Sequence, residues 1–403
     1  MTTEPAAPSS NPSATEQSHV PSAVRAIGGD PADRPKTSSR DHGQLHADLT
    51  RWLSGILPGG AEPVLGQLDV PSGNGMSSET LLFEASWNES GSRRSESLVA
   101  RVAPDPAAAP VFEAYYLDRQ FRVIQEVREL TAVPVPNLRW LETDRSILGE
   151  QFFVMDRVDG VVPTDLPPYA LAGWVAEGTP EQRQRLQDTS VKVLSDLHAI
   201  PGAAERFAFL QPHRTDASSL RQHVIDTRRY YDWTSSDGMR SPLIERSFEW
   251  LDANWPEHEG PTVLSWGDSR IGNMMYRDFA PVAVLDWEMA AVAPPEVDLA
   301  WMAFMHFFFE SMLGKHGLSG LPDLLKPADV AATYAKLSGY EPRDFDWYLT
   351  YNAVRYAIVM FRIGRRALLF GEMEIPEDLD DMTGIREELE ALLAGTSPLF
   401  IGS

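Results

Sequence analysis

Residues 263–288 read VLSWGDSRIGNMMYRDFAPVAVLDWE, and this stretch is the most informative part of the sequence. A short apolar run leads into Gly267 and Asp268, and four residues separate Asp268 from Asn273. A second apolar run then ends at Asp286. Two carboxylates and an amide at strand ends suit a magnesium–phosphate site, because Mg²⁺ prefers hard oxygen ligands and phosphoryl transfer needs a carboxylate beside the attacking hydroxyl.

The composition limits the classes of partner. The chain has 403 residues and a net charge of −23 at pH 7, from 35 Lys and Arg against 58 Asp and Glu. This excess of negative charge argues against DNA, RNA or an anionic membrane surface as partner, because these bind basic footprints. The hydrophobic content of 43% is enough for a sizeable core, and the length suggests two or three structural units.

Cysteine is absent from the sequence. This excludes disulfides, thiolate metal sites and a cysteine nucleophile. The first residues, MTTEPAAPSSNPSATEQ, have neither a basic start nor an apolar run, so we expect no secretory signal. We therefore expect a cytoplasmic protein without a membrane segment.

The pattern of the chain changes along its length. Residues 1–40 are rich in Pro, Ser, Thr and Ala, and we expect a disordered tail because they cannot bury enough apolar surface. From 42 to 57 the pattern predicts a helix that Asp41 caps. From there to about 155, strand-like runs, among them 138–142, surround a second helix that the pattern predicts at 111–130. Beyond 161 the patterns are mostly helical. This order predicts an α+β fold with a strand-rich first part and a helix-rich second part.

The motif around Asp268 resembles that of the aminoglycoside phosphotransferase-type kinases, the small-molecule relatives of protein kinases. The family pattern is H-G-D-x-x-x-x-N, then an apolar strand ending in D-W-E, then P-x-x-D-L-A. The corresponding residues here are Trp266-Gly267-Asp268 through Asn273, then Asp286-Trp287-Glu288, then Pro295-Glu296-Val297-Asp298-Leu299-Ala300. The resemblance implies that Asp268 is the catalytic base and that Asn273 and Asp286 hold Mg²⁺. It also implies that Asp298 is a buried structural carboxylate.

The same resemblance implies a nucleotide site in the strand-rich part. The loop SGNGMSS at 72–78 lies where the family folds over ATP phosphates, and its candidate residues are Gly73, Gly75, Met76, Ser77 and Ser78. A plain hairpin turn is the alternative for this loop. Arg101 lies at the position of the family's phosphate-binding Lys or Arg. The stretch FVMDRVDG resembles the family's hinge, where the backbone C=O of Asp156 and the N–H of Val158 would meet the adenine.

Two positions depart from the family pattern. Trp266 replaces the family's His, and Gln120 lies where many relatives carry the acid that orients the cation at Arg101. Glu113 and Asp118 are the alternatives for that acid. The departures leave open a non-catalytic nucleotide-binding protein, whereas the intact catalytic motif favours an enzyme.

The resemblance implies a bilobal protein-kinase-like fold. We expect an N-lobe at 41–155, a hinge at 156–160, and a C-lobe at 161–403 that carries the catalytic loop and the acceptor site. The implied reaction moves the γ-phosphoryl group of ATP or GTP to a hydroxyl of a small molecule, with Mg²⁺ as cofactor. The sequence gives no indication of the oligomeric state.

Two classes of acceptor remain open. An acidic site would suit the amino sugars after which the family is named. The pattern G-D-x-R-x-G-N followed by L-D-W-E also resembles the kinase domains fused to acyl-CoA dehydrogenases, which act on hydroxyacyl-CoA. That acceptor is anionic and needs a basic patch. Four arginines recur on one predicted C-terminal helix: Arg355, Arg362, Arg365 and Arg366.

Overall fold

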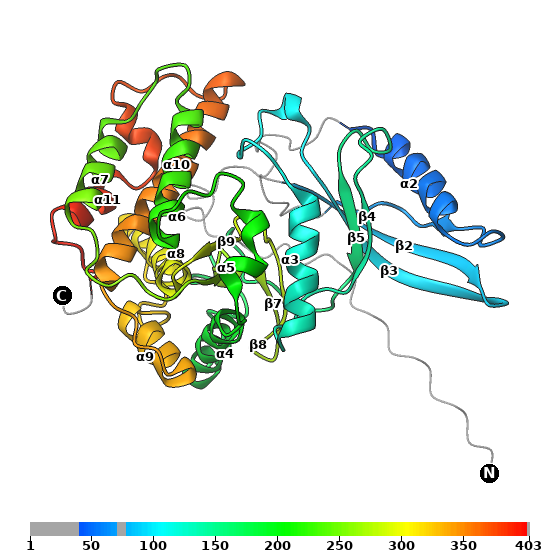
Figure 1. Ribbon diagram of the computed structural model, residues 1–403, viewed down its shortest axis with the longest axis horizontal. Helices are drawn as coiled ribbons and strands as arrows, with labels where there is room; N and C mark the ends of the chain where they lie inside the picture. Colours follow the sequence, from blue (N-terminus) through cyan, green and yellow to red (C-terminus); the bar gives the residue numbers. More distant parts are fainter. Residues whose placement is uncertain (1–39, 71–77, 401–403) are drawn as a thin grey trace, which may run out of the picture. The chain divides into compact units, whose positions relative to one another are not determined.

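The computed structural model describes residues 40–70 and 78–400 of the chain. The expected tail therefore lies outside the described residues except for its last residue, and so do Gly73, Gly75, Met76 and Ser77 of the glycine-containing loop. The described part forms an α+β fold with a strand-rich N-lobe and a helix-rich C-lobe, as the sequence predicts (Figure 1).

The N-lobe contains an antiparallel sheet and two helices. Its elements are α2 (His42–Ile56), β1 (Val64–Leu65), β2 (Glu79–Glu89), β3 (Ser92–Val102), the short turn η2 (Pro106–Ala108), α3 (Leu117–Leu130), β4 (Leu138–Glu142) and β5 (Phe152–Asp156). Its strands lie in the order β1-β2-β3-β5-β4. The hairpin of β2 and β3 turns at Ser90 and Gly91, which both have positive φ.

The apolar run of β5 is explained by helices on both faces of the sheet. Phe152 packs against Trp52 of α2 with ring centroids 4.8 Å apart, and Phe153 packs against Phe121 of α3 at 6.0 Å. Successive side chains of a strand point to opposite faces. A strand covered on both faces therefore needs consecutive apolar residues, which is the pattern of this segment.

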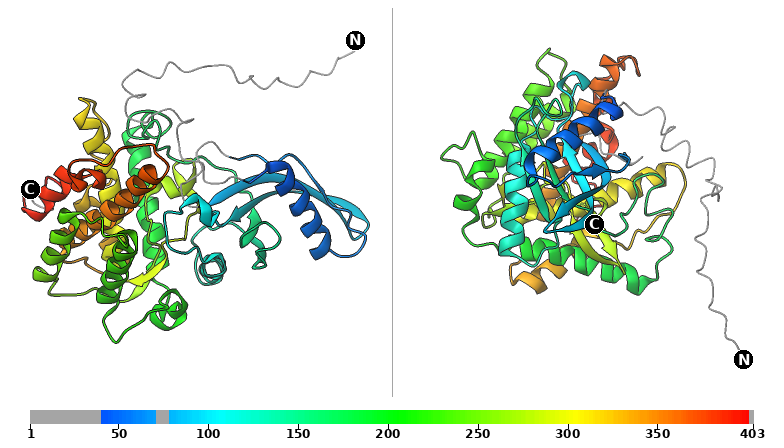
Figure 2. Two further views of the ribbon diagram at one scale, coloured as in Figure 1. Left: turned by 90° about the horizontal axis from the view of Figure 1, so that it is seen from above. Right: turned by 90° about the vertical axis from the view of Figure 1, so that its right-hand side faces the viewer.

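The C-lobe is mainly helical. Its helices are α4 (Pro180–His198), α5 (Ala203–Arg206), α6 (Ser219–Thr234), α7 (Pro242–Ala253), α8 (Pro295–Lys315), α9 (Pro327–Ser338), α10 (Phe345–Leu369) and α11 (Arg386–Leu393), with the short turns η3 (Ala208–Leu210), η4 (Ile271–Asn273) and η5 (Leu379–Thr383). The long helix α8 is buried along most of its length and packs against α10. The left view of Figure 2 separates these green-to-red helices from the blue and cyan strands of the N-lobe. No helix within residues 40–70 or 78–400 has both the length and the apolar character needed to cross a bilayer.

Short strand pairs in the C-lobe bring the quoted stretch together. The strands are β6 (Val263–Ser265), β7 (Met274–Arg277), β8 (Ala280–Val284) and β9 (Ala291–Ala293). β6 pairs with β9, and β7 pairs with β8. The connection between β6 and β7 carries Asp268 and Asn273, and Asp286 follows β8. The three candidate residues thus lie on the segments that connect one strand pair to the other.

The start of α3 differs from the sequence expectation. The helix begins at Leu117 rather than at 111, because side chains of the C-lobe hold the preceding backbone. Tyr230 donates to the carbonyl of Val111 at 2.9 Å, and Arg362 donates to that of Pro110 at 2.7 Å. These partners are distant in sequence, so a local pattern does not reveal them.

Candidate active site

A tight turn after β6 positions Asp268. Gly267 has a φ of +91°, and a Cβ at this position would lie 2.0 Å from the carbonyl oxygen of Met289, so only glycine fits. The carboxylate of Asp298 accepts hydrogen bonds from the backbone N–H groups of Trp266 at 2.7 Å and Gly267 at 2.8 Å. This buried carboxylate fixes the turn.

The side chain of Asp268 is largely buried and is held by two donors. Its Oδ1 accepts from Nε1 of Trp301 at 2.7 Å, and its Oδ2 accepts from Nδ2 of Asn273 at 2.6 Å. Burial raises the pKa of Asp268, and the nearby guanidinium of Arg270 acts in the opposite direction. A carboxylate that is fixed in orientation and more basic than usual is suited to accept a proton.

Asn273 and Asp286 are brought together by contacts between their loops. The N–H of Leu285 donates to the carbonyl of Asn273 at 2.9 Å. The indole N–H of Trp266 donates to the carbonyls of Leu285 at 2.9 Å and Asp286 at 3.2 Å. Asp286 has a φ of +60°, a left-handed conformation that Asp adopts more readily than most residues. Trp266 therefore supports the backbone from which this carboxylate projects.

The oxygen donors of these two residues fit a magnesium ion that also binds phosphate. Within the described part of the chain, both side-chain hydrogen bonds of Asn273 use its nitrogen, which leaves its oxygen as a hard ligand. One carboxylate oxygen of Asp286 binds Arg101. In the same residues, no cluster of three or more His, Asp or Glu side chains could hold a metal ion by itself. One carboxylate and one amide are the protein donors that a magnesium–nucleotide complex uses in kinases.

Arg101 of β3 reaches this region from the N-lobe. Its Nη1 donates to Oγ1 of Thr80, its cross-strand partner, at 2.9 Å, and its Nη2 forms an ion pair with Oδ1 of Asp286 at 2.8 Å. Among the described residues, Asp286 is thus the acid that pairs with Arg101, rather than Glu113 or Asp118. The candidate phosphate cation lies directly against the candidate metal ligand.

The candidate hinge follows β5. Asp156 ends the strand, and its carboxylate accepts from Nδ2 of Asn137 at 2.8 Å and from Nε of Arg139. The N–H of Val158 has no acceptor in the part of the chain that the structure describes. Ser78, the described residue of the glycine-containing loop, is fully buried, and its hydroxyl has no hydrogen-bond partner there either.

A family model decides the assignment of the chain. The model described as "Phosphotransferase enzyme family" matches residues 81–320, which is more than half of the chain. The chain belongs to the phosphotransferase enzyme family. The resemblance drawn from the motif around Asp268 is thereby confirmed.

Solved structures share the fold of this chain. A protein of Ralstonia eutropha assigned as an aminoglycoside phosphotransferase has a TM-score of 0.60 and 21% identity, covering 87% of this chain and 97% of that chain. A thermostable mutant of aminoglycoside phosphotransferase APH(4)-Ia, in a ternary complex with AMP-PNP and hygromycin B, has a TM-score of 0.51 and 13% identity, covering 87% and 99%. At such identities the likeness establishes the bilobal protein-kinase-like fold alone.

The curated relatives of the chain are longer proteins. "Probable acyl-CoA dehydrogenase IBR3" of Arabidopsis thaliana is 24% identical over 360 residues, which cover 85% of this chain and 41% of the relative. "Acyl-CoA dehydrogenase family member 11" of Homo sapiens is 26% identical over 270 residues, which cover 66% of this chain and 31% of the relative. The chain therefore spans less than half of the length of either relative.

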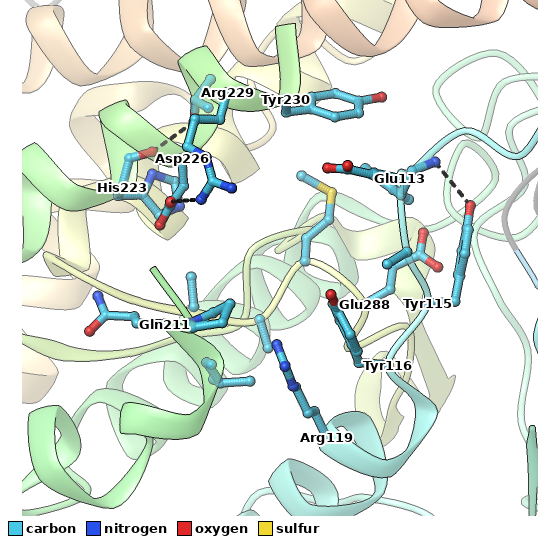
Figure 3. Close-up of a pocket in the computed structure, with 18 of the residues that line it drawn as sticks. Glu113, Tyr115, Tyr116, Arg119, Gln211, His223, Asp226, Arg229, Tyr230 and Glu288 are labelled. Carbon is cyan, nitrogen blue, oxygen red and sulfur yellow. Dashed lines mark hydrogen bonds and ion pairs between the residues drawn. The ribbon is translucent and has the colours of Figure 1, made fainter. Parts of the chain in front are cut away.

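A cavity of about 330 Å³ lies near the loop that carries Asp268 (Figure 3). It is lined by the segment before α3, by α6, by the segment after Asp286 and by α10. Its charged lining residues include Glu113, Arg119, Asp226, Arg229, Glu288 and Arg355. Figure 3 shows Glu113 and Glu288 on one side and Asp226 and Arg229 on the other. Arg355 connects the cavity to the loop, because its Nη2 donates to the carbonyl of Gly267 at 3.2 Å.

The sequence interpretation missed three side chains around Asp268. Trp301 is buried in the core, and its indole N–H also binds the candidate base. Arg270 lies 3.6 Å from Asp268 and 2.8 Å from Asp165. Arg270 could have been found from the sequence, because it is a cation inside the quoted motif. Asp165 carries no such signal, because it lies 105 residues away along the chain.

Proposed function

We propose that this phosphotransferase moves the γ-phosphoryl group of ATP or GTP to a hydroxyl group of a small molecule. The observation that carries the proposal is the Asp268 carboxylate, held by two donors near Asp286 and its partner Arg101. A base, hard oxygen ligands and a permanent cation converge in this arrangement. Phosphoryl transfer depends on such positioning and on stabilisation of the developing charge.

Each candidate residue has a role in the proposed reaction. Asp268 accepts the proton of the attacking hydroxyl, and the oxygen of that hydroxyl forms a bond to the γ-phosphorus. The bond from this phosphorus to the β–γ bridging oxygen breaks, and its electron pair leaves with the nucleoside diphosphate. Arg101 binds phosphate oxygens through its planar fork of donors. Asn273 and Asp286 would hold Mg²⁺, which when bound neutralises phosphate charge.

The proposed nucleotide site lies along the hinge and Arg101. The backbone of Asp156 and Val158 would receive the base, and Arg101 would bind the phosphates. The complex of APH(4)-Ia with AMP-PNP supports a nucleoside triphosphate as donor. A solved aminoglycoside 2'-phosphotransferase-IIIa (TM-score 0.51, 13% identity) binds GDP. Both nucleotides therefore stay in the proposal.

The first candidate acceptor is an aminoglycoside-type compound. Glu113, Asp226 and Glu288 line the cavity beside Arg119, Arg229 and Arg355. Carboxylates in a cavity attract amino groups, and the solved neighbour with hygromycin B binds such a compound. The net charge of −23 favours a cationic acceptor in the same way.

The second candidate acceptor is a hydroxyacyl-CoA, which the names of the curated relatives and the arginines of α10 favour. Arg355, Arg362 and Arg366 form no ion pair within the described residues and donate to carbonyl or amide oxygens instead. Their neighbour Arg365 pairs with Asp237. A largely buried cation without a carboxylate partner is costly, so binding an anionic group would stabilise it.

Nucleotide consumption by the full chain with Mg²⁺ tests the proposal. ATP and GTP are each combined with aminoglycosides, other amino alcohols and hydroxyacyl-CoAs, and Asp268→Ala is the control. Turnover on one class that is lost in the control supports the reaction and identifies the acceptor class. An unchanged rate in Asp268→Ala contradicts it. Mg²⁺-dependent nucleotide binding without turnover on any acceptor would favour a non-catalytic nucleotide-binding protein.

A further inference from the structure

Arg270 connects the candidate base to a distant part of the chain. Its Nη1 donates to both carboxylate oxygens of Asp165, at 2.8 and 3.0 Å, and its Nε lies 3.6 Å from Oδ2 of Asp268. The two carboxylates thus contact two different edges of one planar guanidinium. Arginine can meet both at once, whereas the point charge of lysine cannot reproduce this fork.

Gly272 leaves the space that this ion pair needs. A Cβ at Gly272 would lie 2.6 Å from Nη1 and 3.2 Å from Cζ of Arg270, and 3.4 Å from Oδ1 of Asp165. A larger residue would therefore push the guanidinium away from its partner. The segment R-I-G-N combines the cation with the missing side chain two residues later, so the pair is a built feature of the loop.

The surroundings of Asp268 single out Arg270 as its contacting cation. The charged groups that act on this carboxylate are Arg270 of the same loop, Asp286 after β8 and Arg355 of α10. Arg355 donates to the carbonyl of Gly267 instead. Among the described residues, Arg270 is the cation within 4 Å of the Asp268 carboxylate.

We propose that the ion pair between Asp165 and Arg270 positions the carboxylate of Asp268. Trp301 and Asn273 each bind one oxygen of this carboxylate by a hydrogen bond, and Arg270 attracts the oxygen that Asn273 binds. Asp165 acts through Arg270 by holding its guanidinium in place. Arg270 is therefore a positioning residue, and the inference rests on the proposed function because it takes Asp268 as the base.

The indole N–H signal of Trp301 in the ¹H–¹⁵N spectrum of the full chain tests the inference without any acceptor. Trp301→Phe assigns the signal, and Asp268→Asn shows how it moves when the bond to the base changes. We expect Arg270→Gln and Asp165→Asn to move it in one direction. The double variant should move it no further than Arg270→Gln alone, because one residue acts through the other.

Arg277→Gln is the matched control. Arg277 donates to the carbonyl of Asp159 at 2.8 Å and so links β7 to the candidate hinge, but its contact there is to a backbone carbonyl. We expect the Trp301 signal of this variant to stay unchanged. A shift as large as that of Arg270→Gln would overturn the inference.

Kinetics with whichever acceptor the turnover test identifies give the second readout. We expect Arg270→Gln to lower kcat about 10- to 100-fold with the KM for nucleotide little changed, because a misplaced base affects the chemical step. Arg270→Lys should recover only part of this loss. A folded Arg270→Gln with normal kcat and an unmoved Trp301 signal overturns the inference while Asp268→Ala is inactive. If Asp268→Ala stays active, the proposed function itself fails, and the inference fails with it.

Discussion

Two aspartates of the C-lobe have pKa values that are shifted in opposite directions. Burial by itself raises the pKa of Asp268 in the loop after β6 and of Asp298 in the first turn of α8. At Asp298, hydrogen bonds outweigh burial, and the pKa is lowered. At Asp268, burial prevails, and the pKa is raised.

The donors around the two carboxylates explain this difference. Asp298 accepts from Nε2 of His198 at 3.1 Å, Oγ of Ser265 at 2.8 Å, and the N–H groups of Trp266 and Gly267 at 2.7 and 2.8 Å. Asp268 accepts from Trp301 and Asn273. A carboxylate surrounded by donors is a fixed anion, whereas one with few donors keeps its tendency to bind a proton. The comparison separates a structural acid from a candidate base.

The largest expected effect is that of Asp298→Asn. The variant leaves buried donors without an acceptor, so we expect a loss of about 3–5 kcal/mol in the free energy of unfolding and loss of turnover with it. Urea unfolding and turnover at pH 7 measure both. Asp329→Asn is the control, because Asp329 also lies in the first turn of a helix but is exposed. Normal stability in Asp298→Asn would contradict the structural role.

The same comparison predicts a pH dependence. A carboxyl with a lowered pKa in the folded state contributes stability above its unfolded pKa, and this contribution is lost as the pH falls through the folded pKa. Asp298 therefore belongs to the groups whose protonation unfolds the protein in acid. In Asp298→Asn, the acid-dependent part of the stability should be smaller.

Asp268→Asn should separate activity from stability. We expect turnover to fall about 10²- to 10⁴-fold, because the base is removed, while nucleotide binding is kept. A raised folded pKa means that the stability of the parent protein falls as the pH rises between the unfolded and the folded pKa of this group. The variant lacks that loss, so its melting temperature at pH 7 should equal or exceed that of the parent. A destabilised Asp268→Asn would assign Asp268 to the structural class.

Local sequence patterns explain which parts of the fold and of the candidate site could be predicted. The motif residues Asp268, Asn273 and Asp286 lie within one stretch, so their spacing alone brought them together. The helix α2 could be predicted because Asp41 caps it by accepting from the N–H of Gln44 and its apolar residues are periodic. The strand β4 was predicted at its observed bounds for the same local reasons.

Contacts between distant segments explain what the sequence could not reveal. The acid that pairs with Arg101 is Asp286, 185 residues away, and not a residue of the next helix. Gln120 is buried in α3, and the ion pair expected there is replaced by one to the C-lobe. The opposite pKa shifts of two motif aspartates depend on donors from four different elements. Spacing along the chain carries no record of such donors.

Trp266 contacts both Asp298 and the backbone of Asp286, and its substitution has the smallest expected effect. Its backbone N–H donates to Asp298, while its indole N–H donates to the carbonyls of Leu285 and Asp286. Trp266→Phe keeps the first contact and removes the second. We expect a loss of about 1–2 kcal/mol in unfolding free energy, because buried carbonyls lose a donor. We also expect a higher Mg²⁺ concentration for half-maximal turnover, because Asp286 is less well fixed.

Two measurements on Trp266→Phe distinguish a purely structural role of this residue from a role that also fixes Asp286. Urea unfolding measures the structural part, and turnover against Mg²⁺ concentration measures the part that reaches Asp286. Lower stability with an unchanged Mg²⁺ dependence would mean that Trp266, like Asp298, has a structural role alone. Trp266→His, which restores the family's residue, should recover the Mg²⁺ dependence better than the stability, because an imidazole can still donate a hydrogen bond but does not fill the space of a fully buried indole.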